Sequence, residues 1–131
     1  MSTGVNSHVI KNLNIFTGTK VLIIGDVMID AYDWGSVDRI SPEAPVPIFN
    51  LKKSELRLGG AANVALNIKA LGAEPILLSV IGLDDAGSDF LHILKEAQLS
   101  HEGIVRSSSR CTTIKKRYIA SGQHILRVDQ E

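Results

Sequence analysis

The sequence lacks the features that mark two large classes of protein. It has no surplus of charge, because 14 Lys and Arg residues balance 14 Asp and Glu residues. The broad positive surface that binds a nucleic-acid backbone is therefore not expected. The longest apolar runs, such as residues 21–24 and 75–78, fall far short of the ~20 residues of a membrane-spanning helix. We expect neither a nucleic-acid partner nor a membrane protein.

Cysteine is almost absent as well. Cys111 has no second cysteine for a disulfide or for a pair of metal ligands, and its Ser- and Arg-rich surroundings indicate a loop thiol without a role.

The first eight residues are polar and lack the basic start and apolar core of a secretory signal. We therefore expect a cytoplasmic protein. No metal site is expected either, because metal-ligand spacing is missing from the scattered histidines, which are His8, His92, His101 and His124.

Strands and helices alternate along the 131 residues, a length typical of one domain. A β-branched run over 20–26 ends at a Gly-Asp pair and is typical of a strand buried in a parallel sheet. Helical spacing of apolar residues predicts a helix over 61–71 that Gly72 stops. The chain then predicts a strand over 76–82, a helix capped by Asp84 or Asp85, and a short strand at 104–105. This order predicts an α/β fold with a parallel sheet.

Two β-rich segments interrupt that alternation. Residues 31–58 contain three prolines between 42 and 47, which forbid a helix and favour extended backbone or an edge strand. Residues 112–119 and 124–128 are β-rich runs separated by a short polar turn, which predicts a hairpin. We expect both segments to be ordered and to lie outside the parallel sheet.

Candidate binding residues follow the first strand and open the first helix. Ligands of open parallel sheets bind beyond the carboxyl ends of the strands. Asp26 and Asp30 come just after the first strand, Gly59-Gly60 precedes the helix, and Asn63 lies in its first turn. Free backbone N–H groups at a helix start attract polar or anionic ligands. Each feature alone also fits a turn or a local cap, but together they predict a ligand site.

Two familiar nucleotide motifs are missing. The first strand is not followed by G-x-G-x-x-G, and the chain contains no P-loop. The predicted hairpin does carry cations, and Lys115 and Arg117 share one face of its first strand. They are interpreted either as a clamp for a substrate phosphate or as a solvated face that protects a sheet edge.

Three motifs together resemble the ribokinase-like (PfkB) sugar kinases. They are Gly-Asp-Val-Met-Ile-Asp at 25–30, Gly-Gly-Ala-Ala-Asn-Val-Ala at 59–65, and Ile-Gly-Leu-Asp-Asp-Ala-Gly at 81–87. Residues 39–47, Arg-Ile-Ser-Pro-Glu-Ala-Pro-Val-Pro, together with 112–117 and 123–128, are similar to the heptose-7-phosphate kinase domains of bacterial ADP-heptose synthesis. The resemblance covers about residues 19–131, and it leaves 1–18 as an N-terminal extension.

The resemblance implies the N-terminal part of a ribokinase-like parallel sheet flanked by helices, with a β-rich lid formed by about 31–58 and 111–129. It implies ATP- and Mg²⁺-dependent phosphorylation of a heptose 7-phosphate at O1, for lipopolysaccharide core synthesis. The sugar-phosphate substrate would then meet Asp30, Gly59, Gly60 and Asn63, and Lys115 and Arg117 would be candidates for its phosphate. A homo-oligomer through the lid strands or an exposed sheet edge is also implied.

One departure from the family pattern is large. The Gly-Ala-Gly-Asp motif, which carries the catalytic Asp of these kinases, does not occur in the chain, and most of the ATP site belongs to the same missing half. We therefore expect an N-terminal fragment that is inactive alone and binds ATP poorly. The alternatives are a PfkB kinase for another sugar, such as fructose or ribose, and a sugar-binding or dimerisation module without catalysis.

Overall fold

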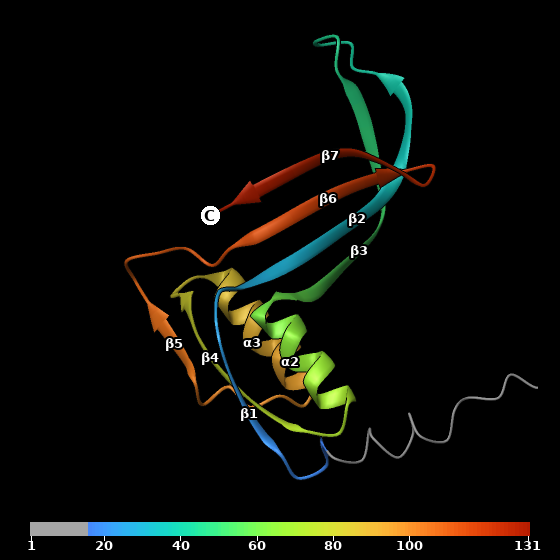
Figure 1. Ribbon diagram of the computed structural model, residues 1–131. Helices are drawn as coiled ribbons and strands as arrows, with labels where there is room; N and C mark the ends of the chain where they lie inside the picture. Colours follow the sequence, from blue (N-terminus) through green and yellow to red (C-terminus); the bar gives the residue numbers. More distant parts are fainter. Residues whose placement is uncertain (1–15) are drawn as a thin grey trace, which may run out of the picture.

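The computed structural model describes residues 16–131 (Figure 1). Residues 1–15, which include His8 and most of the expected N-terminal extension, lie outside the described residues. The described chain forms two sheets. One is a three-stranded sheet with the order β1-β4-β5, and the other is a four-stranded sheet with the order β3-β2-β6-β7. Among the described residues, neither the length nor the hydropathy of any helix suits a membrane span.

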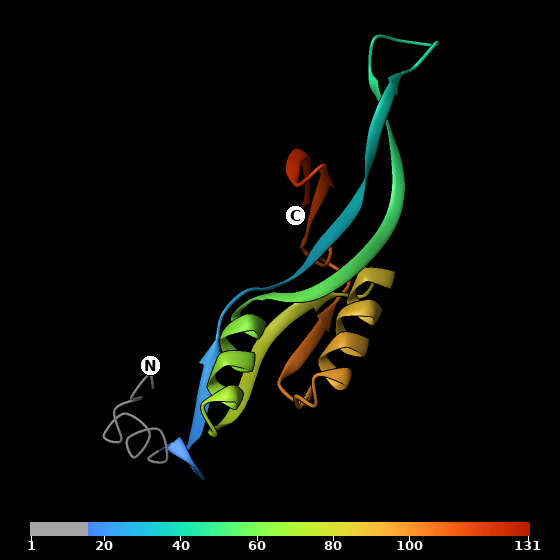
Figure 2. The same cartoon turned by 90° about the vertical axis from the view of Figure 1, so that its right-hand side faces the viewer.

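The three-stranded sheet is parallel and carries both helices on one face (Figures 1 and 2). Its strands are β1 (Lys20–Ile24), β4 (Glu74–Gly82) and β5 (Ile104–Ser107), and its helices are α2 (Ala61–Ala70) and α3 (Asp85–Glu96). On β4, Leu77 and Ile81 are buried against Phe90 and Leu94 of α3. The alternate residues of β4 point to the other face and are more exposed. The predicted parallel α/β core is confirmed.

The four-stranded sheet joins the two β-rich segments. Its strands are β2 (Val27–Ile40), β3 (Pro47–Gly60), β6 (Ile114–Ala120) and β7 (Gln123–Gln130). The pairs β2–β3 and β6–β7 are antiparallel, whereas β2 and β6 run parallel with Ile29 opposite Ile114. Ile29, Ala31 and Leu58 pack into the core beside α2 and α3. We call these four strands the lid sheet.

The proline-rich stretch turns the chain between β2 and β3. Ser41 N donates to Val46 O at 2.8 Å, and Glu43 N donates to Ser41 Oγ at 3.2 Å. The expected extended backbone begins only at Pro47, where the edge strand β3 starts. The prediction was wrong for residues 42–45, because prolines without N–H groups suit a bend whose few hydrogen bonds come from their neighbours. Beyond Gly35 the β2–β3 pair continues as a two-stranded ribbon, seen rising away from the helices in Figure 2.

A hydrogen-bonded junction ties the lid sheet to the helical core. Asp84 caps α3, as one of the two predicted alternatives, by accepting from Gly87 N at 2.7 Å. The same carboxylate accepts from Thr112 N at 2.8 Å and from Thr112 Oγ1 at 2.7 Å, two residues before β6 begins. Thr112 Oγ1 in turn accepts from Gly82 N at 2.9 Å. These bonds connect the end of β4, the start of α3 and the start of β6.

Candidate active site

The Asp30 carboxylate lies on β2 above a glycine of β3. In the antiparallel register Met28 is opposite Gly59 and Asp30 is opposite Arg57, so these residues share one face of the lid sheet. A Cβ at Gly59 would lie 2.5 Å from Asp30 Oδ2 and 2.7 Å from Met28 Cγ. Only a residue without a side chain leaves room for this carboxylate. The two predicted site residues Asp30 and Gly59 are therefore in direct apposition.

Gly60 ends β3 of the lid sheet and directly precedes α2. It adopts φ +59° at the start of α2, and a Cβ there would lie 2.4 Å from Asp26 O. Ala61 N donates to the same Asp26 O at 2.9 Å. One of the N–H groups that we expected to be free at this helix start is therefore used by the protein itself. Gly60 thus brings the start of α2 against the Asp26 backbone and adds no functional group.

Lys115 and Arg117 lie on the Asp30 face, and both already have carboxylate partners. Arg117 Nη1 donates to Asp30 Oδ1 at 2.5 Å and to Lys115 O at 3.2 Å. This hydrogen bond with Asp30 raises the pKa of Arg117 above its ordinary value. Lys115 Nζ lies 3.4 Å from Asp129 Oδ2 and 3.7 Å from Glu131 Oε2. The cations of β6 are thus paired within the lid sheet.

An aromatic layer continues this face and was missed by the sequence analysis. Tyr32 and Trp34 stack with ring centroids 5.6 Å apart. The guanidinium groups of Arg57 and Arg117 lie 4.8 and 5.1 Å from the Tyr32 ring, and Lys53 Nζ lies 4.7 Å from the Trp34 ring. Such distances are typical of cation–π contacts. The alternation Asp30-x-Tyr32-x-Trp34, which puts all three side chains on one face of a strand, was the available signal.

Glu55 organises the cations of β3. It accepts from Arg57 Nε at 2.5 Å and from Lys53 Nζ at 2.9 Å. The hydrogen bond from Arg57, followed by that from Lys53, lowers the pKa of the Glu55 carboxyl. Every one of these residues is at an odd position, so Lys53, Glu55 and Arg57 form one row on β3 beside the aromatic row of β2.

A second charged pair lies on the opposite face of the lid sheet. Asp33 is only 4% exposed, and it accepts from Ser54 Oγ at 2.6 Å and pairs with Lys116 Nζ at 3.2 Å. The hydrogen bond with Asp33 raises the pKa of Lys116. Lys116 therefore joins β2 to β6 structurally, away from Asp30.

Asn63 does not join this cluster. It is exposed on the first turn of α2 and lines an open cavity of about 350 Å³ with Arg57, Leu58 and Glu96. Within residues 16–131 no hydrogen bond connects its amide to Asp30 or Gly59. The structure therefore brings together Asp30, Gly59, Gly60, Lys115 and Arg117, and it leaves Asn63 at the border of the cluster.

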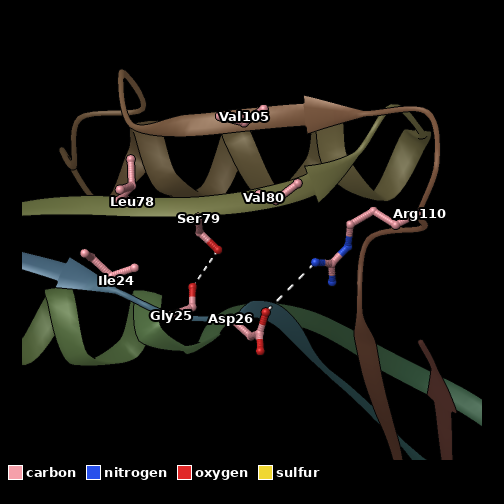
Figure 3. Close-up of a pocket in the computed structure, with 8 residues that line it drawn as sticks. All are labelled: Ile24, Gly25, Asp26, Leu78, Ser79, Val80, Val105 and Arg110. Carbon is pink, nitrogen blue, oxygen red and sulfur yellow. Dashed lines mark hydrogen bonds and ion pairs between the residues drawn. The ribbon is translucent and has the colours of Figure 1, made fainter.

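The other predicted carboxylate lies in a separate cavity on the uncovered face of the parallel sheet (Figure 3). The volume is about 450 Å³, and apolar side chains such as Ile24, Leu78 and Val105 form most of the wall. At its rim Asp26 Oδ1 lies 3.9 Å from Arg110 Nη1. Ser79 Oγ donates to Gly25 O at 2.7 Å. Asp26 and Asp30, which are four residues apart in the sequence, thus face different surroundings.

The cluster around Asp30 has the chemistry of a hydroxyl-binding site. An ionised carboxylate is an acceptor with several lone pairs, and only one oxygen of Asp30 bonds to Arg117. The remaining positions suit the hydroxyl donors of a polyol. Among residues 16–131, no three His, Cys, Asp or Glu side chains come together to hold a metal ion.

Comparison with known sequences gives a consistent result over nearly the whole chain. The sequence model of the pfkB family of carbohydrate kinases matches residues 18–130. Bifunctional protein HldE of Helicobacter acinonychis is 48% identical over 112 residues, which cover 86% of this chain and 24% of that protein. The HldE of Caulobacter vibrioides is 49% identical over 117 residues, which cover 88% of this chain and 24% of that protein. The chain spans about a quarter of the length of these relatives.

Solved structures share the fold at lower identity. A fructokinase of Halothermothrix orenii has a TM-score of 0.59 and 24% identity, over 86% of this chain and 37% of that one. A carbohydrate kinase of Agrobacterium tumefaciens has a TM-score of 0.60 and 18% identity, over 86% of this chain and 35% of that one. A fructokinase of Xylella fastidiosa with bound ATP has a TM-score of 0.56 and 23% identity, over 86% of this chain and 30% of that one. The expected ribokinase-like arrangement is confirmed.

Proposed function

This chain belongs to the pfkB family of carbohydrate kinases, and we propose that it is the sugar-binding and lid part of a kinase that phosphorylates a heptose 7-phosphate at O1. The identity of 48–49% to HldE proteins supports a place close to them. The heptose itself is inferred from the Arg-Ile-Ser-Pro-Glu-Ala-Pro-Val-Pro stretch at 39–47. The product would serve ADP-heptose and lipopolysaccharide core synthesis.

The observation that carries the proposal is the placement of Asp30. Its carboxylate lies against Gly59 and is bonded by Arg117 on one face of the lid sheet. A sugar beneath the lid would donate a hydroxyl hydrogen to this carboxylate, a bond that orients the ring and contributes roughly 1.5–3 kcal/mol. Gly59 and Gly60 would let the sugar approach the backbone, and Asn63 would contribute from the start of α2.

For the phosphate of the substrate, Lys115 is the stronger of the two candidates on this face. Its Nζ lies at 3.4 and 3.7 Å from carboxylates near the end of the described chain. Arg117, by contrast, makes a 2.5 Å hydrogen bond. A long ion pair exchanges its partner for a phosphate at lower cost than a short one whose side chains are only 19% and 22% exposed.

The transfer itself requires groups that these residues do not supply. ATP with Mg²⁺ would provide the phosphoryl group, yet the described residues gather no set of metal-ligating side chains. No Gly-Ala-Gly-Asp sequence is present to provide the catalytic Asp. We therefore assign the chain to substrate binding and lid closure, expect it to be inactive alone, and assign none of its residues to ATP.

Calorimetric titration of the full chain with a panel of ligands tests the proposal. We expect binding of heptose 7-phosphate, weaker binding of the heptose without phosphate, and no measurable binding of ATP–Mg²⁺. Fructose and ribose test for a kinase of another sugar. Preference for either of these over heptose 7-phosphate would overturn the heptose assignment, and ATP binding without sugar binding would overturn the division of roles.

A further inference from the structure

The guanidinium of Arg117 is fixed by three neighbours. Its Nη1 donates to Asp30 Oδ1 at 2.5 Å and to Lys115 O at 3.2 Å. Its Cζ lies 5.1 Å from the centroid of the Tyr32 ring. The side chain is only 19% exposed. Few other orientations are open to a planar group held in this way.

Tyr32 also limits where Arg117 can move. The ring carries a second guanidinium, that of Arg57, at 4.8 Å. Arg57 is itself bonded to Glu55. The two guanidinium groups that share this ring carry like charges, and each is paired with its own carboxylate. For Arg117 that carboxylate is Asp30.

Asp30 in turn depends on Arg117. In the described part of the chain, Arg117 supplies the one hydrogen bond that the Asp30 carboxylate receives. The other oxygen, Oδ2, faces Gly59, which offers no side chain. Without Arg117 the carboxylate would be free to rotate about its χ angles, and it would lose the orientation that a sugar hydroxyl requires.

We infer that Arg117 is a positioning residue, which fixes Asp30 for the sugar and does not itself bind the substrate phosphate. The inference rests on the proposed function, because it takes Asp30 to be the sugar-binding carboxylate. The charge of Arg117 is already neutralised by a short bond to Asp30, whereas Lys115 on the same face has only longer ion pairs. Arg117 and Lys115 therefore have different roles although they lie two residues apart on one strand.

The two roles differ in how they respond to the phosphate of the ligand. Calorimetry is performed with heptose 7-phosphate and with unphosphorylated heptose on the full chain and on Arg117→Gln. We expect roughly tenfold weaker binding of both ligands, by similar factors, because the lost contact acts through Asp30. Lys115→Gln is the matched control, and it should weaken only the phosphorylated ligand. A loss in Arg117→Gln confined to heptose 7-phosphate would overturn the inference.

A double variant tests the dependence directly. If Arg117 acts through Asp30, then Asp30→Asn combined with Arg117→Gln should bind no more weakly than Asp30→Asn alone. The double variant also removes the unpaired charge that could unfold Arg117→Gln, and Arg117→Lys provides a second folded comparison with the charge retained. Losses that add in the double variant would contradict a positioning role.

A measurement without ligand separates this inference from the proposed function. Nitrogen-15 relaxation of the Arg117 Nε–H group should report an ordered side chain in the native sequence and in Asp38→Asn, whose exposed carboxylate lies far along β2. The group should become mobile in Asp30→Asn. An equally ordered Arg117 in Asp30→Asn would overturn the inference. If the native chain binds neither heptose, the proposed function is contradicted and the relaxation result alone decides whether Arg117 fixes Asp30.

Discussion

Asp30 is positioned by its neighbours on either side of β2. On β3 the missing side chain of Gly59 leaves space for the carboxylate, and on β6 the guanidinium of Arg117 fixes it. Neither neighbour is close to Asp30 in sequence. The same residue would be an ordinary surface carboxylate if β3 carried any larger side chain at position 59.

Replacing Gly59 by Ala should therefore disturb the site more than the fold. The new Cβ would lie 2.5 Å from Asp30 Oδ2, so the carboxylate must leave the position in which Arg117 now bonds it. We expect a lower melting temperature together with at least tenfold weaker sugar binding. Gly103→Ala is the matched control, because its Cβ would lie 2.2 Å from Leu77 O and far from the cluster. Equal sugar affinities for the folded forms of both variants would contradict the role of Gly59.

At the scale of elements, the attachment of the lid sheet depends on Asp84. This carboxylate caps α3 and accepts two hydrogen bonds from Thr112. The bonds from Thr112 lower the pKa of Asp84. A carboxyl whose pKa is lowered on folding stabilises the fold above its unfolded pKa of about 3.9, and this stabilisation is lost as the pH falls through the lower folded value.

We accordingly expect Asp84→Asn to be less stable than the native chain at pH 7 by at least about 1 kcal/mol. The difference should shrink as the pH falls below about 4, because the native carboxyl is then protonated too. Chemical denaturation at several pH values measures it. Asp85→Asn, a change at the exposed neighbour, is the control and should have little effect. A difference that does not depend on pH would show that the charge of Asp84 is unimportant.

The sequence predicted the local elements better than their arrangement. The strands at 20–24 and 74–82, both helices and the β6–β7 hairpin follow from periodicity and turn residues that are close together in the chain. The parallel pairing of β2 with β6 has no such signal, because it joins residues more than 80 positions apart. The Arg117–Asp30 bond depends on that pairing, so the sequence offered only a phosphate clamp or a solvated face as interpretations of the basic strand.

At the scale of the whole molecule, the parallel sheet has one uncovered face. α2 and α3 pack on one side, while apolar residues of β1, β4 and β5 are exposed on the other, including Leu22 at 57% and Ile24 at 70%. The lid sheet also exposes Leu126 and Val128 on its edge strand β7. Contiguous apolar surfaces of this kind favour association.

We expect the chain to self-associate through one of these two surfaces. Light scattering over a range of concentrations should give a mass above that of the 14.2 kDa monomer. Ile24→Lys with Val105→Lys tests the uncovered sheet face, and Leu126→Lys with Val128→Lys tests the lid edge. The pair that restores the monomer identifies the surface. A native chain that stays monomeric at high concentration would contradict the expectation.

The account as a whole depends on the carboxylate of Asp30 binding a sugar. The most direct test is the affinity for heptose 7-phosphate of the native chain, of Asp30→Asn, and of Asp38→Asn as the control on the same strand. We predict that the native chain and Asp38→Asn bind equally well and that Asp30→Asn binds at least about tenfold more weakly. Equal affinities in all three proteins would contradict the central claim.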